Sequence, residues 1–298
     1  MRSMSVSIRF AISILVFSIP LAAMTYYLYV AANEMVLFSE KEAAGVQALQ
    51  NYSALHQTVV SQHFKVLKTN QDLTAEEKQK LNSQIESFMT EYLSESFNQK
   101  KLIGAFAKYL KAPVSEKKLG GRFLIFYLEF QTLAQEIADN YNIVLDPDLD
   151  TYYLMENTVI HLKKVFELYF QMLQITGGAD EIMFDFQLER LTKTVDSFEE
   201  TIKKILINLD KTKTQDANFY GELQLFQEQF EGVSANIREQ LREVYSLGIN
   251  SRTTLNDKDK TYIALEALIL KNESLYRQNL DIFNSFLKQR LSVGLPLV

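Results

Sequence analysis

Apolar side chains recur at alternating intervals of three and four residues along most of this chain. The clearest series reads Leu188, Leu191, Val195, Phe198, Ile202, Ile205 and Leu209. Such spacing places every member on one face of an α-helix. A second series reads Leu223, Phe226, Phe230, Val233, Ile237, Leu241 and Val244, and a third reads Gly45, Ala48, Tyr52, Leu55, Val59, Gln62 and Val66. These seams predict an all-α chain with at least one helical bundle.

The breaks between the periodic segments predict short connections between antiparallel helices. Thr74 and Glu77 have the spacing of a capping box, which opens a helix that we expect to reach about Leu110, because Pro113 prevents its continuation. Further helices are expected from Arg122 to about Tyr141 and from Pro147 to Gly177, with later joints at 211–216 and 256–260. We expect these helices to form an elongated antiparallel bundle. The arrangement that we favour is two stacked four-helix modules that share long first and last helices, and a single elongated bundle is the alternative.

The segment from Phe10 to Asn33 contains no charged residue. As a helix it would be about 36 Å long, which is enough to cross a hydrocarbon core of about 30 Å. We therefore predict a transmembrane helix over residues 10–32. Because Arg2 and Arg9 precede it, residues 1–9 are expected in the cytoplasm and residues 33–290 outside.

A cleaved secretory signal is the alternative, with Leu21, Ala22 and Ala23 as the cleavage site. The apolar segment continues past these residues to Tyr29 and Val30, beyond the usual length of a signal core. At the other end of the chain, residues 291–298 are apolar and follow Lys288 and Arg290. They are too few to cross a bilayer, so they are interpreted as the start of a second, truncated transmembrane helix, or alternatively as a frayed tail.

Composition narrows the classes of function. The chain has 47% hydrophobic and 23% charged residues, no cysteine and a net charge of −6. Without cysteine there is no disulfide framework and no thiolate site, and the acidic balance argues against nucleic acid as a partner. The sequence contains no glycine-rich phosphate loop and no nucleophile elbow, zinc-protease or kinase signature. We expect neither enzymatic activity nor a cofactor.

The histidines make a poor metal site. His56 and His63 are separated by two helical turns, about 10.5 Å, which is too far to share one ion. The run Asp146-Pro147-Asp148-Leu149-Asp150 superficially resembles a calcium loop, but Thr151 stands where that loop needs glycine and Asn157 where it needs glutamate. We interpret Asp146, Pro147, Asp148 and Asp150 as the cap and first turn of a helix.

A small set of residues remains as candidate ligand contacts. Arginines match the geometry of a carboxylate, and the candidates are Arg122, Arg190, Arg238, Arg242 and Arg252. Tyr152 and Tyr153 follow the Asp-Pro turn and would line either a pocket or the core. Asn272 and Asn279 lie on the otherwise apolar seam of the last helix, where asparagine commonly fixes helix register or alternatively contacts a ligand.

Two short elements carry a family resemblance. The stretch Leu145-Asp-Pro-Asp-Leu-Asp-Thr-Tyr-Tyr-Leu-Met155 resembles a segment of the helical extracytoplasmic sensor domains of bacterial methyl-accepting chemotaxis proteins, and of some sensor histidine kinases and diguanylate cyclases. The segment Glu40-Lys-Glu42-Ala-Ala-Gly45-Val-Gln is similar to a Glu-x-x-Gly element on the first external helix of such domains. Ala43 departs from that element, since a basic residue is common there.

The resemblance implies a ligand-sensing module in a bacterial cytoplasmic membrane, with the bulk of the chain in the periplasm or outside the cell. It further implies a homodimer, a small-molecule ligand or a solute-binding protein as partner, and signal transduction to a cytoplasmic output domain. The alternatives are the sensor part of a histidine kinase or diguanylate cyclase, and a membrane-tethered helical scaffold or pore-forming protein.

Overall fold

The computed structural model describes residues 6–93, 99–112, 119–145, 149–177, 184–215, 220–250 and 258–294. Every regular element in these ranges is a helix, as the sequence predicts. The helices are α1 (Val6–Thr69), α2 (Ala75–Tyr92), α3 (Gln99–Leu110), α4 (Leu119–Asn140), the short 3₁₀ helix η1 (Ile143–Leu145), α5 (Leu149–Glu156), the π-helix η2 (Asn157–Leu162), α6 (Lys163–Gly177), α7 (Phe184–Gln215), α8 (Tyr220–Asn250) and α9 (Lys258–Gly294).

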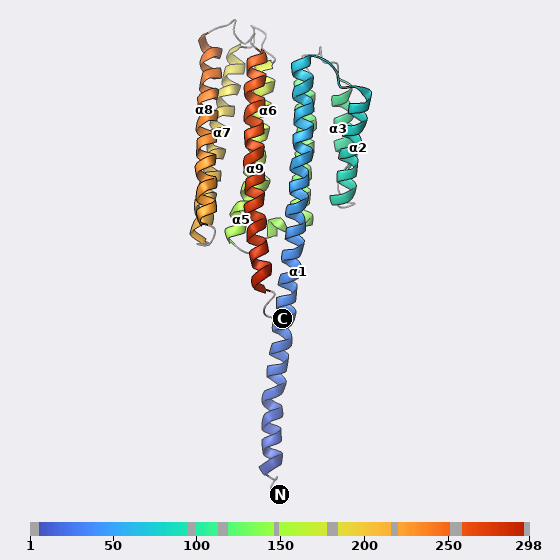
Figure 1. The fold of residues 1–298 in the computed structure, drawn as a ribbon, viewed down its shortest axis with the longest axis vertical. Coiled ribbons are helices and arrows are strands. Elements are labelled where there is room, and N and C mark those ends of the chain that lie inside the picture. Colours follow the sequence, from blue (N-terminus) through green and yellow to red (C-terminus); the bar gives the residue numbers. More distant parts are fainter. Residues whose placement is uncertain are drawn as a thin grey trace.

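Figure 1 shows the helices running alongside one another, with the first part of α1 projecting alone from one end. The second part of α1 packs along α9 and also contacts α4 and α2, whereas α9 contacts α6, α8 and α5. Helices α2 and α4 therefore pack on α1, with α3 packed on α4, whereas α5, α6 and α8 pack on α9, with α7 packed on α5, α6 and α8. The end-to-end stacking of two modules expected from the sequence is not confirmed, because both groups occupy the same stretch of the long axis (Figure 1).

The projecting part of α1 is apolar and exposed. Phe17 is 77% and Tyr27 73% exposed, and Pro20 lies within this part without ending the helix. Among the described residues, α1 is the one helix long and apolar enough to cross a membrane, judged by length and composition. It continues without a break from this segment into the bundle (Figure 1).

Most of the described side chains of the three apolar seams are buried in the core, and Gln62 and Val195 are partly buried. Ala48, Tyr52 and Val59 in α1 are buried. The same holds for Phe198, Ile202, Ile205 and Leu209 in α7, and for Leu223, Phe226 and Phe230 in α8. The 3–4 spacing thus identified the buried face of each helix, because burial on one side is what imposes that period.

The capping box is confirmed, but the extent of the helix that it opens is not. The Glu77 amide donates to Thr74 Oγ1 (3.2 Å), and the Thr74 amide donates to Glu77 Oε2 (2.9 Å). The expected helix to Leu110 is instead divided into α2 and α3, and Leu93 at the end of α2 has an extended backbone. The division allows the apolar face of α3, with Leu102, Phe106 and Tyr109, to pack in the core.

Candidate functional site

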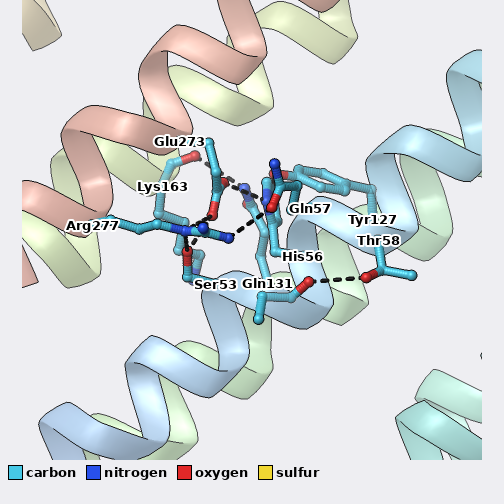
Figure 2. A network of polar contacts seen from close by, with 10 residues as sticks. Ser53, His56, Gln57, Thr58, Tyr127, Gln131, Lys163, Glu273 and Arg277 are labelled. Carbon is cyan, nitrogen blue, oxygen red and sulfur yellow. Dashed lines mark hydrogen bonds and ion pairs between the residues drawn. The ribbon is translucent and has the colours of Figure 1, made fainter.

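The most extensive buried polar cluster of the described residues lies where α1, α4, α6 and α9 meet (Figure 2). Figure 2 shows Glu273 and Arg277 of α9 facing Ser53, His56 and Gln57 of α1. Glu273 is 3% and His56 2% exposed, and Ser53 is fully buried. A carboxylate at such a position requires close partners, because an isolated buried charge is strongly unfavourable.

The Glu273 carboxylate is held from two sides. The Ser53 hydroxyl donates to Glu273 Oε1, and His56 Nδ1 lies 2.8 Å from Glu273 Oε2. Arg277, one turn further along α9, donates from Nε to Ser53 Oγ (3.0 Å) and from Nη2 to Gln57 Oε1 (2.8 Å). Glu273 and Arg277 of α9 are thus joined to Ser53, His56 and Gln57, which lie on one face of α1.

The other nitrogen of His56 extends the cluster into α4. His56 Nε2 is hydrogen-bonded to the Tyr127 hydroxyl. Burial raises the pKa of Tyr127 well above its ordinary value, with a hydrogen bond from Gln131 opposing the shift and the Glu273 carboxylate adding to it. The phenol therefore keeps its proton at neutral pH. Gln131 donates to the Lys163 carbonyl oxygen in α6 (3.0 Å), which completes a polar path across the helices.

The arrangement does not form a catalytic triad. Ser53 is bonded to Glu273 and Arg277, whereas a nucleophilic serine would be bonded to the histidine that removes its proton. The adjoining cavity has about 10 Å³ of free space, enough for about one water molecule. No group of three or more His, Asp or Glu residues in the described ranges is arranged to hold a metal ion. The contacts of the cluster connect α1, α4, α6 and α9.

A second polar cluster links α9 to α5, η2 and α7. Asn279 is fully buried and donates from Nδ2 to the Leu154 carbonyl oxygen (3.0 Å) and to Thr158 Oγ1. Asn157 donates to the Ile205 carbonyl oxygen (3.3 Å) and accepts from Asn208 Nδ2 (3.1 Å). The π-helix η2 presents Asn157 and Thr158 to these partners, and π-helical turns of this kind distort the regular helix at a defined position.

His63, the second buried histidine of α1, has an aromatic environment. Its ring stacks on Phe123 with centroids 3.5 Å apart, and Nδ1 is hydrogen-bonded to the Tyr109 hydroxyl (3.1 Å). Burial lowers the pKa of His63 to about 3, so the ring is neutral at physiological pH. His56 and His63 thus each have their own partners, Glu273 and Tyr127 for the first and Tyr109 for the second.

The candidate ligand contacts from the sequence lie on several helices. Arg122 is on α4 and half-buried, Arg190 is on α7 and exposed, and each has a polar partner. On α5 the ring of Tyr153 packs against Tyr152 and against the Lys211 amine, which is 4.8 Å from its centroid. Asn272 of α9 is 1% exposed. None of these residues lines the cavity beside Glu273, and their role as ligand contacts stays a prediction.

The predicted helix cap falls largely outside the described residues. Asp146, Pro147 and Asp148 are among the residues that the structure does not describe, and the side chain of Asp150 is likewise not described. Helix α5 begins at Leu149, within the predicted first turn. Of the remaining arginine candidates, Arg238 lies on α8, whereas Arg252 and the side chain of Arg242 are outside the described residues.

Sequence reasoning missed the central residues of the first cluster. Ser53 and Glu273 were not singled out, and His56 was considered only as a metal ligand. One signal was available, since Glu273 follows Asn272 on the seam side of the last helix and His56 follows Leu55 on the seam of α1. Two polar residues beside apolar seams predict a buried pair only when the helices are known to be neighbours.

Comparisons with protein-family models, with curated proteins and with solved structures gave no match for this chain.

Proposed function

We propose that the chain is the ligand-sensing, membrane-anchored part of a bacterial chemoreceptor or of a related transmembrane signalling protein. The observation that supports this proposal best is the continuity of α1. This helix passes without interruption from an apolar, exposed segment into the bundle, where it lies along α9. The lower end of α9 lies beside α1 at the end of the bundle from which the apolar segment emerges (Figure 1).

In the proposed topology, residues 1–9 are cytoplasmic, residues 10–32 span the inner membrane and the bundle lies in the periplasm or outside the cell. In this proposal α1 to α4 make up one four-helix module, and the contiguous segment α5–η2–α6 makes up the other together with α7, α8 and α9. The contact between α1 and α9 supports their place at the junction of the two modules. The protein works as a homodimer, and its signal passes through α1 and α9 to a cytoplasmic output domain.

A ligand can shift such a protein only by binding two packings of the helices with unequal affinity. The resulting helix displacement is about 1–2 Å and the coupling free energy about 1–3 kcal/mol, as in other proteins with helix shifts. The buried asparagines and the Glu273 cluster support this proposal, because polar contacts between helices define discrete registers.

Single cysteines test the topology cleanly, because the chain has none of its own. In intact cells, a membrane-impermeant maleimide is expected to label Ser83→Cys on the exposed face of α2. Ser7→Cys should be labelled only after permeabilisation, and Ser18→Cys, within the apolar segment, should be protected in both conditions. Labelling of Ser7→Cys in intact cells, or protection of Ser83→Cys, would contradict the proposed orientation.

Ligand binding is tested by thermal unfolding of the whole chain in detergent with small carboxylic acids and amines. A ligand at a hundred times its Kd stabilises the folded state by about 2.7 kcal/mol. A saturable shift that is reduced by Arg122→Ala or Arg190→Ala would support direct sensing through that residue. Binding that is unaffected by both variants would remove the two arginines from the proposed site.

A membrane-tethered helical scaffold is the second candidate. It is favoured by the small size of the cavity beside Glu273, which is far below the several hundred Å³ of a typical ligand pocket. The scaffold alternative predicts that none of the small molecules changes the unfolding temperature and that disulfide cross-linking of α1 to α9 leaves the protein's cellular role intact.

A further inference from the structure

The cavity at the first polar cluster lies in the bundle interior and has polar walls. It is lined from α1 by Ser53 and His56, from α4 by Gln131, from α6 by Lys163 and from α9 by Glu273 and Tyr276. Its free space of about 10 Å³ corresponds to about one water molecule. An organic ligand is excluded by size, since ligand pockets are roughly 300 Å³ or larger.

Two buried groups on the cavity wall have unused hydrogen-bonding capacity. The Tyr276 side chain is 3% exposed, and its hydroxyl has no hydrogen-bond partner among the protein atoms. Among the described residues His56 Nδ1 contacts Glu273 Oε2, while a carboxylate oxygen has two lone pairs. A buried hydroxyl is costly without a partner, whereas a water molecule between a donor and an acceptor satisfies both.

A metal cation fits this site poorly. Arg277 Nε lies 3.8 Å from Glu273 Oε1, so a cation bound by this carboxylate would meet a positive charge beside it. A neutral molecule that both donates and accepts hydrogen bonds has no such penalty.

We propose that this cavity is a binding site for one ordered water molecule, which accepts a hydrogen bond from the Tyr276 hydroxyl and donates one to the Glu273 carboxylate. The water completes the polar contact between α9 and the helices around it. This inference is independent of the proposed sensing function, since it concerns only the packing of the bundle.

Two tyrosines of similar burial provide a matched test. Tyr169 of α6 is fully buried, its hydroxyl also has no partner among the protein atoms, and it does not line the cavity. Tyr276→Phe removes a hydrogen bond to the water and is expected to reduce the ratio of folded to unfolded protein roughly tenfold. Tyr169→Phe removes an unpaired hydroxyl and should leave this ratio unchanged or increase it.

Both variants are measured by denaturant unfolding of the whole chain in detergent, and a crystal structure of the wild-type protein at about 1.8 Å or better gives the direct readout. A density peak within hydrogen-bonding distance of Tyr276 Oη and Glu273 Oε2 is the expected result. An empty cavity in that map would overturn the proposal. So would a Tyr276→Phe variant as stable as the wild type, because loss of the hydrogen bond to the water is expected to lower the folded-to-unfolded ratio roughly tenfold.

Discussion

At the scale of single residues, the close approach of α1 to the turn after α4 depends on Gly45. A Cβ atom built at this position would lie 2.4 Å from Tyr141 Cβ and 2.7 Å from Ile143 Cδ1. No rotamer of a larger side chain relieves these contacts, because the Cβ atom itself collides. The turn is further defined by Asn142, which has a positive φ of 61° and accepts a hydrogen bond from Lys41 Nζ (3.2 Å).

Gly45→Ala is therefore expected to destabilise the protein by about 1–3 kcal/mol, the usual cost of overpacking. Gly104→Ala in α3 is the matched control, because a Cβ atom there meets nothing within 4 Å. Alanine at that helical position should stabilise by about 0.5–1 kcal/mol. Thermal unfolding of both variants measures the difference. If Gly45→Ala were as stable as Gly104→Ala, the approach of the two segments at Gly45 would be looser than the structure indicates.

His63 makes a prediction about pH. Its pKa is lowered from 6.5 to about 3 in the folded state by burial, so between these values the unfolded chain binds more protons than the folded one. Stability should then fall as the pH decreases below about 6.5, by up to about 1.4 kcal/mol per pH unit from this residue.

The His63→Phe variant isolates this contribution. Phenylalanine preserves the stacking on Phe123 but does not titrate, and Tyr109 loses its partner equally at every pH. Between pH 6.5 and 4 the variant should lose stability less steeply than the wild type. Parallel curves for the two proteins, measured by denaturant unfolding, would exclude a buried neutral His63.

At the scale of elements, the two asparagines of α9 were predicted alike but differ in their contacts. Asn279 donates to Leu154 and Thr158 in the neighbouring helix, whereas Asn272 Nδ2 is buried without a hydrogen-bond partner. The amide nitrogen of Asn279 is thus hydrogen-bonded and that of Asn272 is not, although both residues lie on the same seam. The 3–4 spacing of the seam does not distinguish the two asparagines.

Replacement by leucine should reveal this difference. Asn279→Leu leaves the Leu154 carbonyl oxygen and the Thr158 hydroxyl without their amide donor, and we expect a loss of about 1–3 kcal/mol. Asn272→Leu removes a buried, unbonded amide nitrogen and should be neutral or stabilising. Urea unfolding of the two variants provides the comparison. If Asn272→Leu were the more harmful change, the register of α9 would depend on Asn272 instead.

At the scale of the whole molecule, α1 and α9 are joined by polar contacts along their length. Besides the Glu273 cluster, Gln50 Nε2 donates to Asp281 (2.8 Å) and Lys68 pairs with Glu266. The last two are exposed or partly exposed and contribute little to stability. The buried Glu273 contact therefore dominates the polar part of this interface.

Removing one partner of the His56–Glu273 contact should lower the free energy of unfolding more than removing both partners. Glu273→Leu leaves the Ser53 hydroxyl and the His56 ring without their carboxylate partner, and a loss of about 1–3 kcal/mol is expected. The double variant His56→Leu, Glu273→Leu should recover part of this loss, because it leaves fewer buried polar groups unpaired. A double-mutant cycle of thermal unfolding measures the coupling, and strictly additive effects would indicate that His56 and Glu273 do not interact.

Local features could be predicted from the order of residues alone: the all-helical class, the apolar first segment, the buried faces of α1, α7 and α8, and the capping box at Thr74. Each of these depends on residues within a few turns of one another, so periodicity and capping are sufficient to find them. The folded arrangement was needed to show that α2 and α3 are separate, that His56 contacts Glu273 and that Asn279 is hydrogen-bonded through its amide nitrogen. These features depend on which helix faces which, and that choice is made by packing between segments far apart in the chain.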